Sequence, residues 1–395
     1  MATVRLFIFS LILFSGCNCA FGQLQDIGTL PIAMKEISGI IQDGKGQYIA
    51  INDSGNPNEL YVLSENGKLL RKVEVKNAKN KDWEAITSDR NGNLFIADLG
   101  NNGNKREKLV IYKVNEADVY QNSYVYALPI EIKYADQKKF PPKEKHLNYD
   151  VEALIHHNHK LYAFTKNRTR PFTGYTYVYE IEIQSDKQKV KRVDSLFLGS
   201  DKVNNRVTDA AISRDQRHLV LLSHDRIWMI SDFALGKFSS GYIQEIALGH
   251  ISQKESLCFN SDSTLAICDE RTSLLGGKLY EFNLSKNIAH IDSIRKHEVF
   301  IPNPKFEDTL NIHLDLNIAG EVYFEIFNHN MKRVDFQKIG LFEKGQHTVS
   351  ISPKGMINAE YMLNIIVGNR PHGFFVKRFK EIDWNELYNP TDTVD

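Results

Sequence analysis

The sequence has no excess of either charge, and beyond its first residues it has no long apolar run. Lys and Arg together number 49, as do Asp and Glu, so the formal net charge is zero. Proteins that bind nucleic acids or anionic membranes usually carry a positive balance, so we expect no nucleic-acid partner. No later segment is apolar enough to cross a bilayer as a helix, and we expect no transmembrane segment.

Cysteine is also scarce, with four residues in the whole chain. Cys17 and Cys19 lie near the start, which leaves Cys258 and Cys268 on either side of a polar turn at 260–263. In an antiparallel hairpin these two residues would lie nearly opposite each other. The spacing therefore allows a cross-strand disulfide in an oxidising compartment, or two buried thiols. The sequence leaves both open.

The first residues have the features of an export signal. Arg5 precedes an apolar stretch at 6–14, which is too short to span a bilayer, and small residues at positions 20 and 22 would suit cleavage. We expect a signal peptide over 1–22, with lipidation of Cys17 as the alternative. The protein is then exported, and is either secreted or held at the outer-membrane surface.

A pattern of short apolar runs recurs five times along the chain. Each unit has a cluster of acidic or small residues, an apolar run, a polar turn and a second run that ends in polar residues. The paired runs are 35–41 with 48–56, 81–87 with 94–102, 149–155 with 161–168, 207–213 with 219–226, and 253–259 with 265–272. A third and a fourth run usually follow. Short runs of near-alternating polarity indicate antiparallel strands.

Repeated four-stranded sheets favour one architecture. A single sheet of this kind cannot bury both faces, but several packed radially can. We predict an all-β protein in which residues 23–298 form a β-propeller with five clear four-stranded repeats, a sixth blade being left open. Residues 24–32 are typical of an outer strand that pairs with the last blade and closes the ring. A long β-sandwich is the alternative that the repeat disfavours.

The same pairing predicts a polar face. In an antiparallel hairpin the start of the first strand and the end of the second lie at the same end, so polar residues from each repeat should ring the mouth of the central channel. The predicted ligand-binding residues are Asp53, Glu84, Asp98, Asn101, Glu152, Lys166, Asp209, His224, Glu255, Glu270 and Arg271. The alternative for Asp and Asn at strand ends is that they stabilise turns.

The carboxylates in this set need compensation. Glu84, Glu152, Asp209 and Glu255, one per repeat, would repel by about 4 kcal/mol per pair at about 4 Å and an effective dielectric near 20. The basic residues that could offset this repulsion are Lys166, Arg168, Arg271 and Arg106. A bound cation such as Ca²⁺ could also do so, because it prefers carboxylate oxygens.

The sequence leaves the activity open. No Gly-x-Ser-x-Gly, His-Glu-x-x-His or phosphate-loop motif is present, so no catalytic residue is assigned. One interpretation is binding of a small molecule, a glycan or a protein at the channel face. A second is hydrolysis of a phosphate ester or lactone assisted by Ca²⁺ on the four carboxylates, with His224 or a carboxylate as the general base. A third is a structural interaction module.

The pattern changes after about residue 300. Short alternating runs over 299–380 predict a small β-sandwich, followed by an acidic tail at 381–395. This part resembles the C-terminal sorting domain of the bacterial type IX secretion system. The matching segments are 302–304, 310–312, 322–327, 332–334, 345–351, 361–368 and 377–379. The resemblance implies the type IX machinery as a partner, and export through the outer membrane.

Residues 30–290 are similar to bacterial propellers grouped with the esterase-like phytase-like and SdiA-regulated proteins. The segments that carry this resemblance are 52–55 (NDSG), 82–84 (DWE), 97–102 (ADLGNN) and 150–154 (DVEAL). That group mostly has no assigned activity, so the resemblance implies the fold and no particular reaction.

Overall fold

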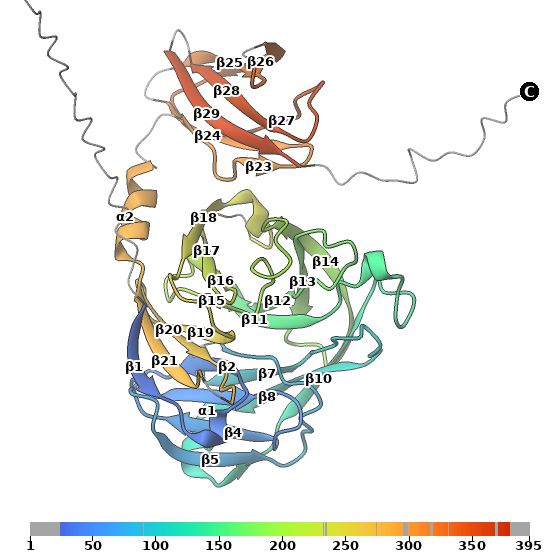
Figure 1. The fold of residues 1–395 in the computed structure, drawn as a ribbon, viewed down its shortest axis with the longest axis vertical. Coiled ribbons are helices and arrows are strands. Elements are labelled where there is room, and N and C mark those ends of the chain that lie inside the picture. Colours follow the sequence, from blue (N-terminus) through green and yellow to red (C-terminus); the bar gives the residue numbers. More distant parts are fainter. Residues whose placement is uncertain are drawn as a thin grey trace, which may run out of the picture.

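The computed structural model describes residues 24–379, apart from 90, 232, 234, 274, 295–298, 317–318, 331 and 368–369. The predicted signal peptide, the lipidation site at Cys17 and the acidic tail lie outside the described residues. The fold class is confirmed, because the described chain is almost entirely β-sheet and forms a propeller followed by a sandwich (Figure 1).

The described residues form five blades. In each, the first strand is innermost, and the following strands pair outward. Blade 1 contains β2 (Ile37–Gln42), β3 (Tyr48–Asn52), β4 (Glu59–Leu63), β5 (Leu69–Val75) and β9 (Tyr124–Val125). Blade 2 contains β6 (Ala85–Ser88), β7 (Asn93–Asp98), β8 (Leu109–Asn115) and β10 (Leu128–Tyr134), with α1 (Glu116–Gln121) after β8. Blade 3 contains β11 (Val151–His157), β12 (Lys160–Thr165), β13 (Tyr175–Glu182) and β14 (Lys187–Phe197).

The last two blades follow the same order. Blade 4 contains β15 (Asp209–Ile212), β16 (His218–Leu222), β17 (Arg226–Ser231) and β18 (Tyr242–Ala247). Blade 5 contains β19 (Lys254–Ser261), β20 (Thr264–Asp269), β21 (Lys278–Asn283) and the N-terminal β1 (Gln25–Thr29). Short 3-10 turns lie at η1 (Ile32–Met34), η2 (Glu144–His146) and η3 (Phe238–Ser240).

The blades close into a ring. Each inner strand packs against the next, in the order β2, β6, β11, β15, β19 and back to β2. A separate apolar core fills each space between neighbouring blades in the described chain. Trp83 lies fully buried between blades 1 and 2, and Trp228 lies between blades 3 and 4. Because apolar burial grows with every blade interface, ring closure adds a further core that an open array would lack.

The N-terminal strand completes the last blade, as predicted. Strand β1 pairs antiparallel with β21, with Gln25 opposite Glu281 and Thr29 opposite Lys278. This pairing joins the two ends of the propeller, and it covers the outer edge of β21, which would otherwise expose unpaired backbone groups.

Close approach of the inner strands makes Gly39 sensitive to substitution. A Cβ on Gly39 would lie 2.9 Å from the backbone nitrogen of Ile86 in the next blade. We expect Gly39→Ala to destabilise the protein by about 1–3 kcal/mol, as overpacking usually does. Gly44→Ala is the matched control, because a Cβ there meets nothing within 4 Å. Urea unfolding measures both, and equal stabilities of the two variants would contradict the packing described.

The two described cysteines are free and buried. Cys258 pairs across the hairpin with Ala266, and Cys268 pairs with Ser256, so the two thiols are not directly opposite each other. Burial raises the pKa of both thiols. Of the two alternatives, the structure therefore has buried thiols and no disulfide.

The C-terminal part is a two-layered sandwich. After α2 (Ser285–Ile294), one sheet contains β22 (Val299–Phe300), β24 (Leu310–Leu316) and β27 (Gly345–Ile351). The other contains β23 (Lys305–Phe306), β29 (Arg370–Arg378), β28 (Glu360–Val367), β25 (Gly320–Phe327) and β26 (Arg333–Phe342). The two sheets share one apolar core. The exact domain limits, 23–298 and 299–380, stay predictions.

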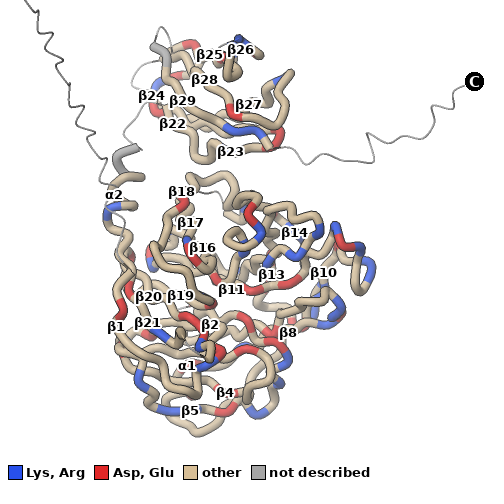
Figure 2. Tube along the Cα trace, in the orientation of Figure 1, with Lys and Arg blue, Asp and Glu red and all other residues tan. Residues whose placement is uncertain are grey.

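Acidic and basic residues are interspersed over the propeller and the sandwich (Figure 2), in keeping with the zero net charge. None of the helices in the described part of the chain has the length and apolar character needed to span a bilayer.

Candidate functional site

One residue from each blade lines the same mouth of the channel. In blades 1, 3 and 5 the pairing of the inner strand with the second strand shifts by one residue near its start. The residues left without a partner on the second strand are Ser38, Glu152 and Glu255. Glu84 and Thr208 occupy the corresponding positions of blades 2 and 4, where their backbone N–H groups bond Ala97 and Leu222 of the second strand. An irregularity of this kind re-aims a side chain away from the regular pleat.

Two of these residues join neighbouring blades through their hydroxyls. Ser38 donates to the carbonyl of Trp83 at 2.6 Å, and Thr208 donates to the carbonyl of Lys254 at 2.7 Å. The ring therefore contributes three carboxylates to the mouth, those of Glu84, Glu152 and Glu255.

Asp209, which we expected in this ring, lies one residue further along. Its carboxylate is buried between blades 4 and 5 and accepts the backbone N–H groups of Ala210 and Leu257, each at 2.7 Å. Burial raises its pKa well above the usual value. Asp209 therefore ties two blades together, and Thr208 occupies the mouth position. Thr208 and Asp209 are adjacent and both polar, so the spacing of the repeats cannot tell which of the two faces the mouth.

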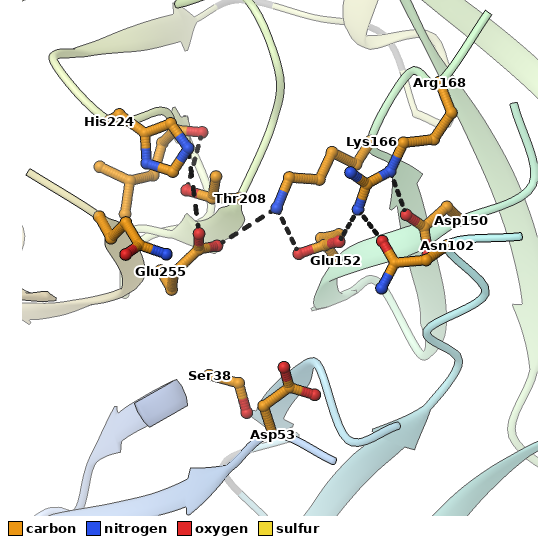
Figure 3. Close-up of polar contacts among 12 residues, drawn as sticks. Ser38, Asp53, Asn102, Asp150, Glu152, Lys166, Arg168, Thr208, His224 and Glu255 are labelled. Carbon is orange, nitrogen blue, oxygen red and sulfur yellow. Dashed lines mark hydrogen bonds and ion pairs between the residues drawn. The ribbon is translucent and has the colours of Figure 1, made fainter. Parts of the chain in front are cut away.

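A chain of ion pairs crosses the side of the mouth formed by blades 3 and 5 (Figure 3). The ammonium of Lys166 lies 2.9 Å from Glu152 and 3.5 Å from Glu255. Arg168 lies 2.7 Å from Asp150 and 3.0 Å from Glu152, and it also bonds Asn102. Burial tends to lower the pKa of Lys166, but Glu152 and Glu255 outweigh this and raise it. Each of these three carboxylates thus has a cationic partner, although burial still raises the pKa of Glu152 to about 8.

His224 and Glu270 lie at the edge of this network. The Nε2 atom of His224 is 4.0 Å from Glu255, and its Nδ1 atom is buried with no hydrogen-bond partner in the described chain. Burial lowers the pKa of His224, which favours the neutral imidazole. Burial and the nearby carboxylates of Glu255 and Asp53 raise the pKa of Glu270 to about 8.

A second group of carboxylates lies on the side of blades 1 and 2. Asp53, Asp82 and Glu84 each place a carboxylate oxygen within 4.8 Å of the other two. The side chain of Glu84 is almost wholly buried, and no hydrogen bond or ion pair to its carboxylate is found among the described residues. Figure 3 shows Asp53 facing the ion-pair network from the opposite wall, beside Ser38.

The absence of a side chain at position 100 makes room for this group. A Cβ on Gly100 would lie 2.5 Å from the carboxylate of Asp82 and 2.7 Å from Oε1 of Glu84. Glycine at this position therefore leaves the space into which the two carboxylates converge. We call Asp53, Asp82 and Glu84 the carboxylate cluster.

The carboxylate cluster is not neutralised. Burial raises the pKa of Asp82 to about 6, with Asp53 and Asp150 adding to the effect. Burial likewise raises the pKa of Glu84 well above its usual value, followed by the charges of Glu152 and Asp53. Two like charges 4.8 Å apart repel by about 3–4 kcal/mol at an effective dielectric near 20. The cluster therefore favours protons or a bound cation.

The remaining predicted residues hold the loops behind the site. Asp98 pairs with Arg106 at 2.9 Å and accepts the backbone N–H of Asp82. Asn101 donates its backbone N–H to Asp150 at 2.6 Å and accepts that of Arg106. Arg271 donates to the carbonyl of Leu30 at 2.7 Å, beside the closing N-terminal strand. These three residues position the site and do not line it.

Asp82 and Asp150 were missing from the predicted set. Each lies two residues before the mouth glutamate of its blade, in the repeated pattern Asp-x-Glu at 82–84 and 150–152. The pattern occurs at the start of the inner strand in both blades, so its repetition could have marked both aspartates as mouth residues. Arg168 was expected only as a compensating charge, and the structure puts it at the centre of the network.

Five blades around a channel with one highly charged mouth define the chain as a small β-propeller with a candidate binding face. Residues 25–238 match the SdiA-regulated family, which is more than half of the chain. The chain belongs to the SdiA-regulated family.

Several solved structures are similar at low sequence identity. PorZ, a surface component of the type IX secretion system of Porphyromonas gingivalis, is 13% identical with a TM-score of 0.33, and the match covers 87% of this chain and 45% of PorZ. The PQQ-bound aldose sugar dehydrogenase of Streptomyces coelicolor is 10% identical with a TM-score of 0.41, covering 67% and 98%. A putative gluconolactonase is 9% identical with a TM-score of 0.37, covering 67% and 89%. No curated protein matches the chain. At these values the similarities carry no inference about ligand or reaction.

Proposed function

We propose that the protein is a ligand-binding propeller that holds a divalent cation, Ca²⁺, on its carboxylate cluster and binds its ligand through that ion. The observation that carries the proposal is the convergence of Asp53, Asp82 and Glu84, with Glu84 buried and without a partner in the described chain. Buried charges in proteins are paired or bind metals. On the opposite wall Lys166 and Arg168 pair with other carboxylates, and among the described residues no ion pair to this group is found.

The geometry suits calcium. Each Ca²⁺–oxygen bond is about 2.4 Å long, so oxygens on opposite sides of the ion are up to about 4.8 Å apart. The oxygens of the cluster lie within that limit. Calcium takes about 6–8 oxygen ligands, and three carboxylates supply about three to six of them. The remaining positions would face the channel and accept oxygens of a ligand.

The test is terbium luminescence, because Tb³⁺ replaces Ca²⁺ and Trp83 adjoins Glu84 in the chain. We expect sensitised emission that Ca²⁺ displaces, and we expect Glu84→Gln to weaken Tb³⁺ binding at least tenfold. Glu281→Gln, on β21 away from the channel, is the control and should bind normally. Equal Tb³⁺ affinity of wild type and Glu84→Gln would refute the cation site and favour a purely structural role.

A side chain at position 100 is expected to weaken binding of the cation. In Gly100→Ala the added Cβ would push aside the carboxylates of Asp82 and Glu84. We expect Ca²⁺ affinity, measured by isothermal titration calorimetry, to fall about tenfold or more. Gly103→Ala is a nearby control, because its Cβ would meet only the flexible side chain of Lys105, at 3.5 Å or more. Unchanged affinity in Gly100→Ala would place the ion elsewhere.

Hydrolysis of a phosphate ester or lactone is the second candidate, and His224 is the observation that favours it. Its lowered pKa leaves the imidazole neutral, and its place beside Glu255 at the mouth suits a general base. The imidazole would take a proton from the attacking water and return it to the oxygen that leaves as the ester or lactone bond breaks. Asp53, Asp82 and Glu84 would hold a cation that polarises that bond. We expect ester or lactone turnover that Ca²⁺ supports and His224→Gln removes. Turnover that survives His224→Gln would exclude this role.

We also propose that the C-terminal sandwich directs the exported protein through the type IX secretion system. The sequence resemblance and the two-layered sandwich support this. Deletion of residues 299–395 should leave the protein inside the cell envelope, whereas the full chain should reach the surface or the medium. Surface delivery of the deleted form would contradict the proposal, and N-terminal sequencing of the secreted form would test cleavage after residue 22.

A further inference from the structure

A polar groove lies between blade 3 and the sandwich. It consists of two adjoining hollows of about 380 and 260 Å³, which share Tyr175, Ser195 and Glu307 among their lining residues. Volumes of about 300–1,000 Å³ are typical of small-ligand sites. The groove opens on the outer side of the propeller, formed by β13 and β14, and takes no residue from the channel mouth.

Specific contacts beside the groove join the propeller to the sandwich. The backbone N–H of Ile243 bonds the carbonyl of Pro302 at 2.9 Å, and the rings of Phe197 and Phe379 lie 4.7 Å apart. The hydroxyl of Tyr175 donates to Glu307 at 3.3 Å across the junction. Because these contacts join both parts of the chain, the groove is already formed before any ligand binds.

The propeller wall presents an aromatic surface. Tyr175 and Tyr177 alternate on β13 and so point to the same side, opposite Phe197 and Ser195 of β14. The guanidinium of Arg192 lies 4.2 Å from the ring centre of Tyr177. In the described part of the chain that guanidinium has no hydrogen bond and no ion pair. Its N–H groups are therefore available to a ligand in the groove.

The groove is rich in hydrogen-bonding groups and nearly balanced in charge. The basic residues Arg192, Lys237 and Lys305 are offset by Asp194 and Glu307. Asn303, Asn311 and Ser239 add neutral polar groups to the lining. A polyanion would require a clear positive excess, and an apolar ligand would leave these polar groups without partners.

We infer that this groove binds a neutral oligosaccharide. A pyranose ring has an apolar face of C–H groups and a rim of hydroxyls, and tyrosine offers the complementary combination of an apolar face and a polar tip. Planar amide, carboxylate and guanidinium groups satisfy the hydroxyls in both donor and acceptor roles. Two hollows in line would hold successive sugar units. The site is separate from the carboxylate cluster and does not depend on the cation.

The test is saturation-transfer NMR on the full chain with maltotetraose, cellotetraose, mannotetraose and N-acetylchitotetraose as probes, and tetragalacturonate as an anionic probe. We expect transfer to at least one neutral probe, and at least tenfold weaker binding to Tyr177→Ala. Tyr126→Ala is the control, since Tyr126 is an exposed tyrosine outside the groove. Glu84→Gln should bind the sugar normally, which separates this site from the cation site.

Three results would overturn the inference. The first is the absence of transfer to all four neutral probes in a sample whose thermal unfolding is normal. The second is a preference for the anionic probe, and the third is undiminished binding to Tyr177→Ala. Arg192→Ala, on the exposed edge of the same wall, provides a second variant in case Tyr177→Ala fails to fold.

Discussion

Metal-free protein is expected to lose stability as the pH rises from about 4 to about 8, and Ca²⁺ is expected to restore it. Burial raises the pKa of Asp82 to about 6 and that of Glu270 to about 8 in the folded chain. An acid whose pKa is raised on folding binds its proton more tightly in the native state. Stability is therefore greatest below the unfolded pKa, and it falls until the pH passes the folded value.

The size of this effect can be estimated. One pKa unit corresponds to about 1.4 kcal/mol, and both carboxyls are partly in contact with solvent, so we discount the full shift to about 2–4 kcal/mol for the pair. That corresponds to a fall in Tm of about 3–7 °C for a propeller of this size. Calcium at about 100 times its Kd should add about 2.7 kcal/mol at pH 8. A Tm in EDTA that rises over this pH range, or one that Ca²⁺ leaves unchanged, would contradict the account of the mouth.

Replacement of Lys166 by methionine is expected to destabilise the propeller strongly. Its ammonium is the shared partner of Glu152 and Glu255, which come from blades 3 and 5. Removal of one member of a buried ion pair typically costs about 3–5 kcal/mol, because the other charge stays buried without compensation. We expect a fall in Tm of about 5–9 °C at pH 7 in thermal unfolding.

Lys160→Met is the matched control. Lys160 also lies near two carboxylates, 2.7 Å from Glu180 and 2.8 Å from Glu182, but on the exposed outer part of blade 3. Ion pairs in contact with water contribute about 1 kcal/mol or less. Similar losses for the two variants would mean that burial at the mouth does not control the energetics of the network.

The propeller could be predicted from the sequence because the pattern that defines each hairpin is local. Alternating apolar residues and polar turns define each hairpin, and the hairpin alone determines which residues share an end. Glu84, Glu152, Lys166, His224 and Glu255 were placed at the mouth by this reasoning, and the structure brings them there.

What the sequence could not show depends on register and on distant contacts. A shift of one residue separates Thr208 at the mouth from Asp209 between blades, and the two polar side chains are indistinguishable by pattern. The division of the mouth into an ion-paired network and a cluster without ion pairs in the described chain also depends on which blade the long side chains of Lys166 and Arg168 reach. The groove beside blade 3 needs two segments far apart in sequence, and no local pattern marks it.

The most direct test of the central claim is a crystal structure of the protein soaked with Mn²⁺, read from the anomalous difference map. The account predicts one strong peak at the channel mouth, with Asp53, Asp82 and Glu84 as its protein ligands. A map with no peak there, or with a metal bound only at other carboxylates, would contradict it.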